Sequence, residues 1–209
     1  TNKIYVANQN SANVTVIDGS YNTTATVTAG TTPQAVAVNP VTNKIYVANL
    51  GSANVTVIDG TDNSTQTVAA GTNPYAVAVN PVTNKIYVAN NGSTNVTVID
   101  GTNNTTATVA AGTNPQDVAI NPVTNKIYVA NFSSGNVTVI DGTNNSTQTV
   151  AAGTAPYAVA VNPVTNKIYV ANINSSNVTV IDGTNNSTAT VTAGVNPGAV
   201  AVNPVTNKI

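Results

Sequence analysis

The sequence predicts an all-β fold, a five-bladed β-propeller with four antiparallel strands in each blade. Three observations lead to this prediction. The tetrapeptide Thr-Asn-Lys-Ile recurs every 41 residues, and each period contains four short extended runs. Between these runs stand Asn, Gly, Asp and Pro, which favour turns, while the runs consist mainly of Val, Thr, Ile, Tyr and Ala. Four strands in about 40 residues are typical of a propeller blade.

The repeat accounts for almost the whole chain. Copies of the tetrapeptide begin at Thr1, Thr42, Thr83, Thr124, Thr165 and Thr206. Five periods of 41 residues make 205 of the 209 residues. A whole number of equal repeats without a polar capping repeat favours a ring over an open stack, which would need capped ends. We therefore expect residues 1–209 to form one single domain of 41-residue repeats.

The four runs, here called A to D, are justified in order on one copy. Run A (35–39, AVAVN) holds only Ala and Val before its Asn, as expected for crowded strands around a central axis. Run B (44–49, KIYVAN) is rich in β-branched and aromatic residues. Run C (54–59, NVTVID) and run D (65–71, TQTVAAG) alternate, which indicates strands with two different faces.

Turn chemistry separates the runs. Asn-Pro-Val-Thr-Asn lies between A and B, and its Pro has no N–H for a central ladder. Asp-Gly opens the C–D connection, and Gly-x-x-Pro links D to the next A. The Asp of each C–D turn recurs at Asp18, Asp59, Asp100, Asp141 and Asp182. We expect these carboxylates to accept backbone N–H groups of the turn, because a spacing of 41 residues separates them too far to share a Ca²⁺ ion.

Ring closure makes a specific prediction about the termini. The last run A, residues 199–203, should join the first B–C–D set, which extends from Ile4 to about Gly30, so that the two ends close within one blade. A conflict follows, because 206–209 repeats the residues 1–4 and both copies fit the same place. We expect one copy to fray, or to pair with another chain in a strand-exchanged homo-oligomer.

Composition excludes several classes of function. Only 6% of the residues are charged and the net charge is −1, so neither nucleic acid nor an anionic membrane finds a cationic surface. The longest apolar runs are about five residues, far short of the roughly 20 that cross a bilayer, so no membrane insertion is expected. The absence of His, Cys, Glu and Arg removes most catalytic and metal-binding groups. We expect no enzyme activity, no metal and no cofactor.

Differences between the copies gather in two connections, B–C and D–A, which antiparallel strands place at the same end of each blade. The variable residues that we take as a candidate ligand face are Gln34, Leu50, Tyr75, Gln116, Asp117, Phe132, Tyr157 and Ile173. Two interpretations are open. The aromatic residues suit sugar stacking or protein contact, whereas drift in exposed loops would produce the same variation.

Asp117 stands where the other four copies have Ala. It is the only charge in the variable set. A polar contact near the axis and an incidental substitution are both compatible with it.

The sequence Asn-Lys-Ile-Tyr-Val-Ala-Asn, followed by Asn-Val-Thr-Val-Ile-Asp-Gly and Ala-Val-Ala-Val-Asn-Pro, resembles the YVTN-type β-propeller repeat. Here the signature reads Tyr-Val-Ala-Asn, as at Tyr46 to Asn49, with Ala in place of Thr. The resemblance covers the whole chain. It implies a surface-layer-associated or secreted protein of archaea or bacteria, often with seven blades, and therefore an extracellular or cell-surface location.

Together these observations predict a non-enzymatic scaffold or binding module, whose ligand is an unknown protein or a carbohydrate. Two alternatives are open at this point. The chain could be an engineered or excised repeat fragment without a selected function. It could also be the propeller part of an enzyme whose site lies outside this chain.

Overall fold

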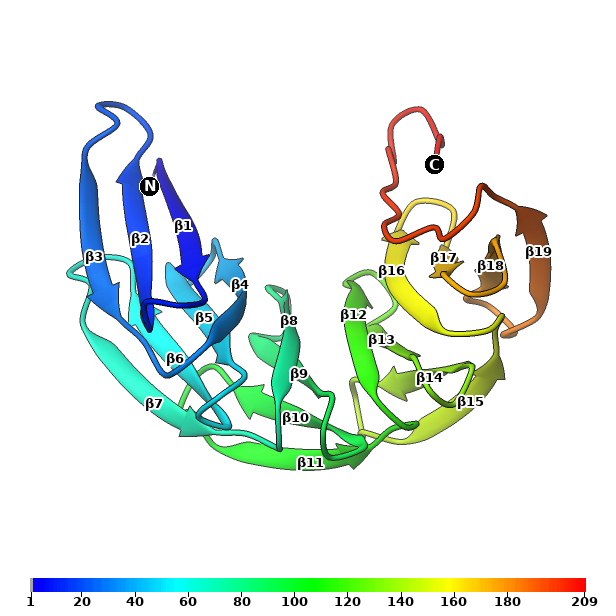
Figure 1. The fold of residues 1–209 in the computed structure, drawn as a ribbon, viewed down its shortest axis with the longest axis horizontal. Helices are drawn as coiled ribbons and strands as arrows, with labels where there is room; N and C mark the ends of the chain where they lie inside the picture. The colour runs from blue at the N-terminus through cyan, green and yellow to red at the C-terminus, as the bar shows by residue number, and fades with distance from the viewer. Residues whose placement is uncertain (1) are drawn as a thin grey trace. The chain divides into compact units, whose positions relative to one another are not determined.

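The computed structural model describes residues 2–209, and all of its regular structure is β-strand. Nineteen strands form five antiparallel sheets (Figure 1). The expected all-β class and the four-stranded repeat are confirmed, whereas the propeller arrangement of the sheets stays a prediction. The described residues contain no helix of the length and hydrophobicity that crossing a membrane requires.

The bounds of the strands follow the repeat closely. The first sheet contains β1 (Lys3–Asn8), β2 (Asn13–Asp18) and β3 (Thr24–Thr28). The second contains β4 (Pro33–Asn39), β5 (Lys44–Asn49), β6 (Asn54–Asp59) and β7 (Thr65–Ala69). The third contains β8 (Pro74–Asn80), β9 (Lys85–Asn90), β10 (Asn95–Asp100) and β11 (Thr106–Ala110). The fourth contains β12 (Pro115–Asn121), β13 (Lys126–Asn131), β14 (Asn136–Asp141) and β15 (Thr147–Ala151). The fifth contains β16 (Pro156–Asn162), β17 (Lys167–Asn172), β18 (Asn177–Asp182) and β19 (Thr188–Thr192).

The chain contacts divide into two compact units. The first unit comprises the described residues up to Ser93 together with Thr97–Thr108, and the second comprises Thr94–Val96 and Val109–Ile209. In the first unit β4 lies beside β1 and β8, and in the second β12 lies beside β16. The prediction of one single domain over 1–209 stays a prediction.

Each four-stranded sheet is a meander in which sequence neighbours pair. In the second sheet Val36 pairs with Val47, and Ile45 with Ile58. The side chains of β5 and β6 are buried on both faces, whereas β7 exposes all its side chains except Val68. The central strands are therefore covered from both sides, and the fourth strand lies at the surface.

Run A begins two residues earlier than its AVAVN pattern indicates. Strand β4 starts at Pro33, and its register shifts between Pro33 and Ala35. The same shift separates Pro115 from Asp117 and Pro156 from Ala158. Such a bulge leaves one residue unpaired and re-aims its side chain. In these three strands the variable residue after the Pro is this bulge residue, which the sequence pattern did not reveal.

The C–D turns confirm the role expected for their Asp residues. Asp59 Oδ1 accepts from the backbone N–H of Thr61 at 2.9 Å, and Asp182 Oδ1 accepts from Thr184 at 2.9 Å. The left-handed residue of this turn is Asn, as at Asn63 with φ of 63°, and not the Gly that follows the Asp. The Gly has another task, because a Cβ on Gly60 would lie 2.8 Å from the carbonyl oxygen of Asn43. It lets the C–D and A–B turns approach each other.

Closure of the termini is not seen in the sheet topology. The first sheet has three strands, and residues 199–202 belong to no strand. Instead, Asn203 and Lys208 form a bridge of their own, with the Asn203 N–H donating to the Lys208 carbonyl at 2.8 Å. In the other sheets run A pairs with a run B that follows after a short turn. The expected partner here lies about 200 residues away, and the cost of closing a loop rises with its length. Of the competing copies, 206–209 takes the local pairing, while Thr1 lies outside the described residues.

Candidate functional site

The two variable connections meet at one end of each sheet. The N–H of Leu50, after β5, donates to the Thr32 carbonyl before β4 at 2.9 Å. The N–H of Phe132 donates to the Asn114 carbonyl at 2.9 Å in the same manner, and that of Ile173 to Ala155 at 3.1 Å. A left-handed residue stands in each D–A turn, for instance Asn114 with φ of 53°. The loops that vary in sequence are thus tied together by their backbones, which holds their side chains on a rigid base.

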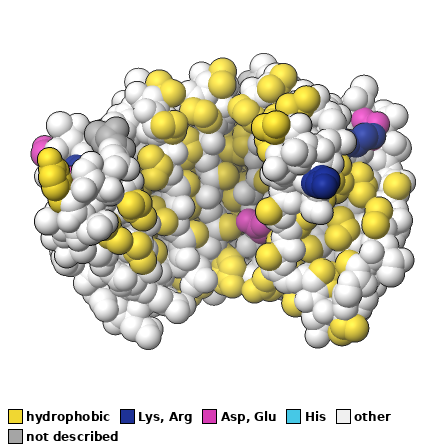
Figure 2. Space-filling model, turned by 90° about the horizontal axis from the view of Figure 1, so that it is seen from above, with side chains coloured by type: hydrophobic (Ala, Val, Ile, Leu, Met, Phe, Trp, Pro, Cys, Tyr) yellow, Lys and Arg dark blue, Asp and Glu magenta, His cyan; other side chains and the backbone are white. Residues whose placement is uncertain are grey.

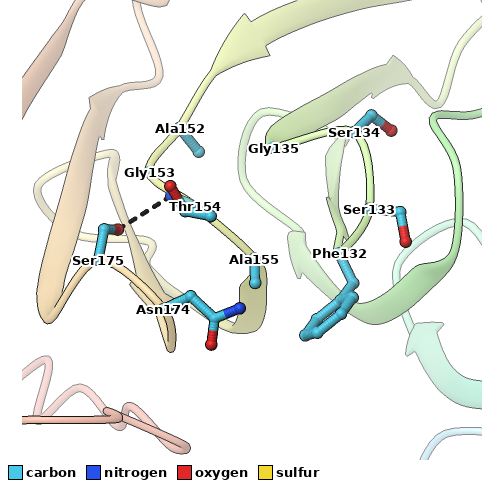
Figure 3. A pocket seen from close by; sticks show the side chains of 10 residues that line it. All are labelled: Phe132, Ser133, Ser134, Gly135, Ala152, Gly153, Thr154, Ala155, Asn174 and Ser175. Carbon is cyan, nitrogen blue, oxygen red and sulfur yellow. Dashed lines mark hydrogen bonds between the residues drawn. The ribbon is translucent and has the colours of Figure 1, made fainter.

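A pocket of about 550 Å³ opens between such loops in the second unit. Its walls come from the β13–β14 loop, the β15–β16 loop and the β17–β18 loop (Figure 3). The lining residues are Phe132, Ser133, Ser134, Gly135, Ala152, Gly153, Thr154, Ala155, Asn174 and Ser175. None of them carries a charge. This size lies within the usual range of small-molecule sites, roughly 300–1,000 Å³.

One wall of the pocket is aromatic. The Phe132 ring stands next to Ala155 in Figure 3, and its centroid lies 6.3 Å from that of Tyr157. The interplanar angle is 74°, an edge-to-face contact that suits the quadrupoles of the two rings. Tyr157 is the bulge residue of β16, so the register shift directs this ring toward the loop of the neighbouring sheet. Phe132 and Tyr157 were both predicted as ligand-face residues, and the structure brings them into contact.

The opposite wall is polar. The Ser175 hydroxyl accepts from the backbone N–H of Thr154 at 2.9 Å, which holds the β17–β18 loop against the β15–β16 loop. The side chain of Asn174 is exposed and points toward the same opening (Figure 3). The side chain of Thr154 is exposed as well, and so are those of Ser133 and Ser134 on the Phe132 loop. The pocket therefore combines an aromatic surface with hydroxyl and amide groups that can donate and accept hydrogen bonds. Ser133, Ser134, Thr154, Asn174 and Ser175 were not among the residues predicted from the sequence.

Gly135 explains part of the hollow. The corresponding residues of the other B–C turns also have positive φ, between 50° and 51°, but they are Ala12, Ala53, Thr94 and Ser176. Only this copy has Gly at the position, with φ of 62°. A Cβ there would meet nothing nearer than the Gly153 carbonyl oxygen, at 3.6 Å. The missing side chain leaves open space between the first and second loops of the pocket.

Asp117 joins β12 and β16, the first strands of the fourth and fifth sheets. Its Oδ1 accepts from its neighbour Val118 at 2.9 Å, and its Oδ2 accepts from the backbone N–H of Val159 in β16 at 2.9 Å. Burial raises the pKa of this carboxyl, and the two backbone N–H groups oppose that shift in part. Of the two open interpretations of Asp117, neither is decided; the contacts of its carboxylate are to backbone groups of the protein itself.

The remaining candidates fall outside this pocket. Ile173 follows β17 directly and precedes Asn174, which lines the pocket. Gln116 is the half-buried bulge residue of β12. In the first unit, Gln34 Oε1 accepts from the Gln9 side chain at 2.9 Å. Leu50 and Tyr75, also in that unit, are half-buried and line none of the four described pockets.

Two titratable side chains have strongly shifted pKa values. Hydrogen bonding to Lys167 and to Thr184 lowers the pKa of Asp182 to about 2, so this carboxylate is a turn acceptor and a weak base. Burial, with the nearby charge of Asp182, raises the pKa of Tyr128 to about 12. No group of three or more potential metal-ligating side chains occurs within residues 2–209. The visible face in Figure 2 is correspondingly poor in charge.

Comparisons with known proteins show the fold alone. No protein-family model matches the chain, and no curated protein matches it either. Many solved structures are similar in fold. A functionally unknown protein from Desulfotomaculum acetoxidans DSM 771 superposes with a TM-score of 0.83 at 15% identity, over 98% of this chain and 70% of that one. Hydrazine synthase of Kuenenia stuttgartiensis gives 0.63 at 17% identity, over 97% of this chain and 87% of that one. The protein U3-55K gives 0.75 at 8% identity, over 90% of this chain and 59% of that one.

Proposed function

We propose that this protein is a non-enzymatic scaffold of propeller blades whose B–C and D–A loops bind a neutral carbohydrate. The observation that carries the proposal is the uncharged pocket beside the Phe132 and Tyr157 rings. Sugars present apolar C–H faces, which pack on aromatic rings, and many hydroxyl groups, which pair with Ser, Thr and Asn side chains. A pocket without charge is unsuited to phosphate, sulfate or carboxylate groups, which would be desolvated without a counter-charge.

The non-enzymatic part of the proposal is supported by the use of the reactive groups. The carboxylates of the C–D turns are engaged by backbone N–H groups, and Asp117 is held by Val118 and Val159. The buried tyrosine of run B, as at Tyr128, stays protonated at neutral pH. None of these groups reaches the pocket as a base or nucleophile.

The location that fits this function is the cell surface or the extracellular medium, as the resemblance to YVTN-type repeats suggests. A module that displays diverse loops on repeated, rigid sheets suits recognition of glycans there. A surface with few charges and no cationic patch is compatible with such an environment and offers little to nucleic acid.

The test is a glycan array followed by calorimetric titration with the best neutral glycan. We expect Phe132→Ala and Asn174→Ala each to weaken binding at least tenfold. Leu50→Ala removes the side chain at the position equivalent to Phe132 in the second sheet, and it should leave binding unchanged. If no neutral glycan on the array binds, or if the wild type and Phe132→Ala bind equally well, the proposal is refuted. Preference for anionic glycans would do so too.

A further inference from the structure

The sheets within each unit pack on one another through one repeated apolar contact. We call the side of a sheet that carries Ile45, Val47 and Ile58, or their equivalents, the leading face. The opposite side, with the equivalents of Tyr46, Val55, Val57 and Val68, is the trailing face. The trailing face of the first sheet packs on the leading face of the second, that of the second on the third, and that of the fourth on the fifth.

The leading face of the first sheet has no such cover. Ile4 is 49% exposed and Val6 is 42% exposed. Their equivalents in the second sheet, Ile45 and Val47, are fully buried. Burial of aliphatic side chains is the main favourable term of association. This side of β1 therefore leaves apolar surface in water that the equivalent strands β5, β9, β13 and β17 bury.

The trailing face of the fifth sheet is open in the same way. Val191 is 54% exposed, whereas its equivalent Val150 is 5% exposed. Around it lies an apolar hollow of about 250 Å³ lined by Tyr169, Val178, Val180, Val191 and Ile209. The two open faces are the two complementary halves of the contact that recurs inside each unit.

The C-terminal residues show what belongs on the trailing face. Asn162 Nδ2 donates to Asn207 Oδ1 at 2.9 Å, as Asn39 donates to Asn84 at 2.8 Å between the second and third sheets. The antiparallel bridge between Asn203 and Lys208 is equivalent to the pairing of Asn39 with Lys44 in the second sheet. Ile209 lines the hollow from the position that Ile45 holds in the second sheet. Residues 203–209 thus reproduce the beginning of a leading face, up to its first apolar side chain.

We propose that the trailing face of the fifth sheet binds the leading face of the first sheet of a second copy of this chain, head to tail. Residues 199–203 of one copy would then add to the open edge of β1 in the other. The register of the complete sheets places Val200 opposite Val6, and Asn203 opposite Lys3, as Val36 lies opposite Val47 and Asn39 opposite Lys44. The incoming Ile4 displaces Ile209 from the hollow, because both occupy the same column of the repeat.

The second copy is the occupant that the repeat itself specifies. Each open face is complementary to the side chains of the other, and a second copy carries both: the leading face on its first sheet and the trailing face on its fifth. Such an interface is heterologous, because different surfaces meet, so it generates closed rings or longer chains of molecules. The open edge of β1 adds backbone hydrogen bonds to the apolar contact.

A mixing experiment tests this arrangement. Sedimentation velocity should show species larger than the monomer that grow with concentration for the wild type. Val6→Asp blocks the leading face and Val191→Asp the trailing face, so each variant alone should be monomeric. An equimolar mixture should form a one-to-one complex, because each variant keeps one intact face. Val82→Asp changes a turn residue that is already 74% exposed, and it should associate like the wild type.

Circular dichroism and urea unfolding establish that the variants are folded. Removal of residues 206–209 tests the same contact without introducing a charge. It clears Ile209 from the hollow, so it should strengthen association at least threefold. A wild type that stays monomeric up to millimolar concentration, as closure within one chain would produce, overturns the proposal. A mixture that yields no one-to-one complex overturns it as well, and so does association weakened by removing residues 206–209.

Discussion

Phe132 and Tyr157 meet edge to face, with ring centroids 6.3 Å apart and an interplanar angle of 74°. The first residue belongs to the loop after β13 and the second to the bulge of β16, so the contact joins two sheets of the second unit. Phe132 also lines the pocket. The packing of the two sheets and the proposed ligand recognition thus both depend on the Phe132 ring.

A double-mutant cycle measures this contact. We expect Phe132→Ala and Tyr157→Ala to show a coupling free energy of about 0.5–1.5 kcal/mol in urea unfolding, the usual value of an aromatic pair beyond its buried area. The matched cycle uses the equivalent positions of the first unit, Leu50→Ala and Tyr75→Ala. Because that pair lacks a second aromatic ring, its coupling should be smaller. Equal coupling in the two cycles would contradict the aromatic interpretation.

Two glycines are needed for different reasons: Gly142 for a close contact between turns, and Gly135 for its left-handed backbone. At Gly142 a Cβ would lie 2.8 Å from the carbonyl oxygen of Asn125, which accepts from the Gly142 N–H at 2.9 Å. Gly142→Ala should therefore lower the free energy of unfolding by about 2–3 kcal/mol. At Gly135 the only cost is the left-handed backbone, about 1 kcal/mol. Gly135→Ala should therefore be the less destabilising variant, and its methyl group should shrink the pocket. Thermal unfolding of both variants measures the two losses. A lower unfolding midpoint for Gly135→Ala than for Gly142→Ala would contradict the prediction.

Asp117 predicts a pH dependence with a definite sign. Its pKa is raised in the folded protein, chiefly by burial, so the native state holds this proton more tightly than the unfolded chain. The resulting stability is complete below the ordinary value of 3.8 and is lost as pH rises through the raised pKa. We expect the free energy of unfolding of the wild type, relative to Asp117→Asn, to fall as pH rises above 3.8. A constant difference over this range in urea titrations would refute the raised pKa.

Asp182 should behave in the opposite direction. Its pKa of about 2 reflects the hydrogen bond from Lys167, whose Nζ lies 2.7 Å from Oδ2, and the turn N–H of Thr184. Its contribution is therefore present above pH 3.8 and disappears as pH falls toward 2. Carboxyl carbon NMR titration should show Asp182 titrating below Asp141, whose Oδ1 accepts from Thr143. Lys167→Ala should raise the pKa of Asp182; an unchanged value would exclude Lys167 as its main cause.

Much of the fold follows from local patterns, which explains why it could be predicted. Runs of β-branched residues and the turns between them are specified within a few residues, so strands such as β5 and β6 begin and end where the sequence indicates. The bulge at Gln34 escaped prediction because its register is decided across the strand pair, where Pro33 and Ala35 choose their partners on β5. Closure of the termini depends on groups about 200 residues apart, which a local pattern does not determine.

The candidate site was predictable in part for the same reason. Variation between copies pointed to Phe132 and Tyr157, because a scaffold of equal repeats makes any bulky exception visible. It could not point to Ser175 or Thr154, which recur in other copies and gain their role from the loops that surround them. Gly135 was the one available signal, since it replaces Ala, Thr or Ser at a left-handed position.

The Asn of the A–B turn provides the last prediction. Asn121 is fully buried; its Nδ2 donates to Asn166 Oδ1 at 2.8 Å, and its Oδ1 accepts from the N–H of Val123 at 3.1 Å. Asn121→Ala leaves buried partners unsatisfied, so it should lower the free energy of unfolding by about 1–3 kcal/mol. Asn203 accepts from its own turn in the same way but is exposed, and Asn203→Ala should cost about 0.5 kcal/mol or less. Urea unfolding of both variants separates the contribution of the buried Asn121–Asn166 bond from that of the hydrogen bonds within the turn. Equal losses of stability would mean that the bond to Asn166 contributes nothing.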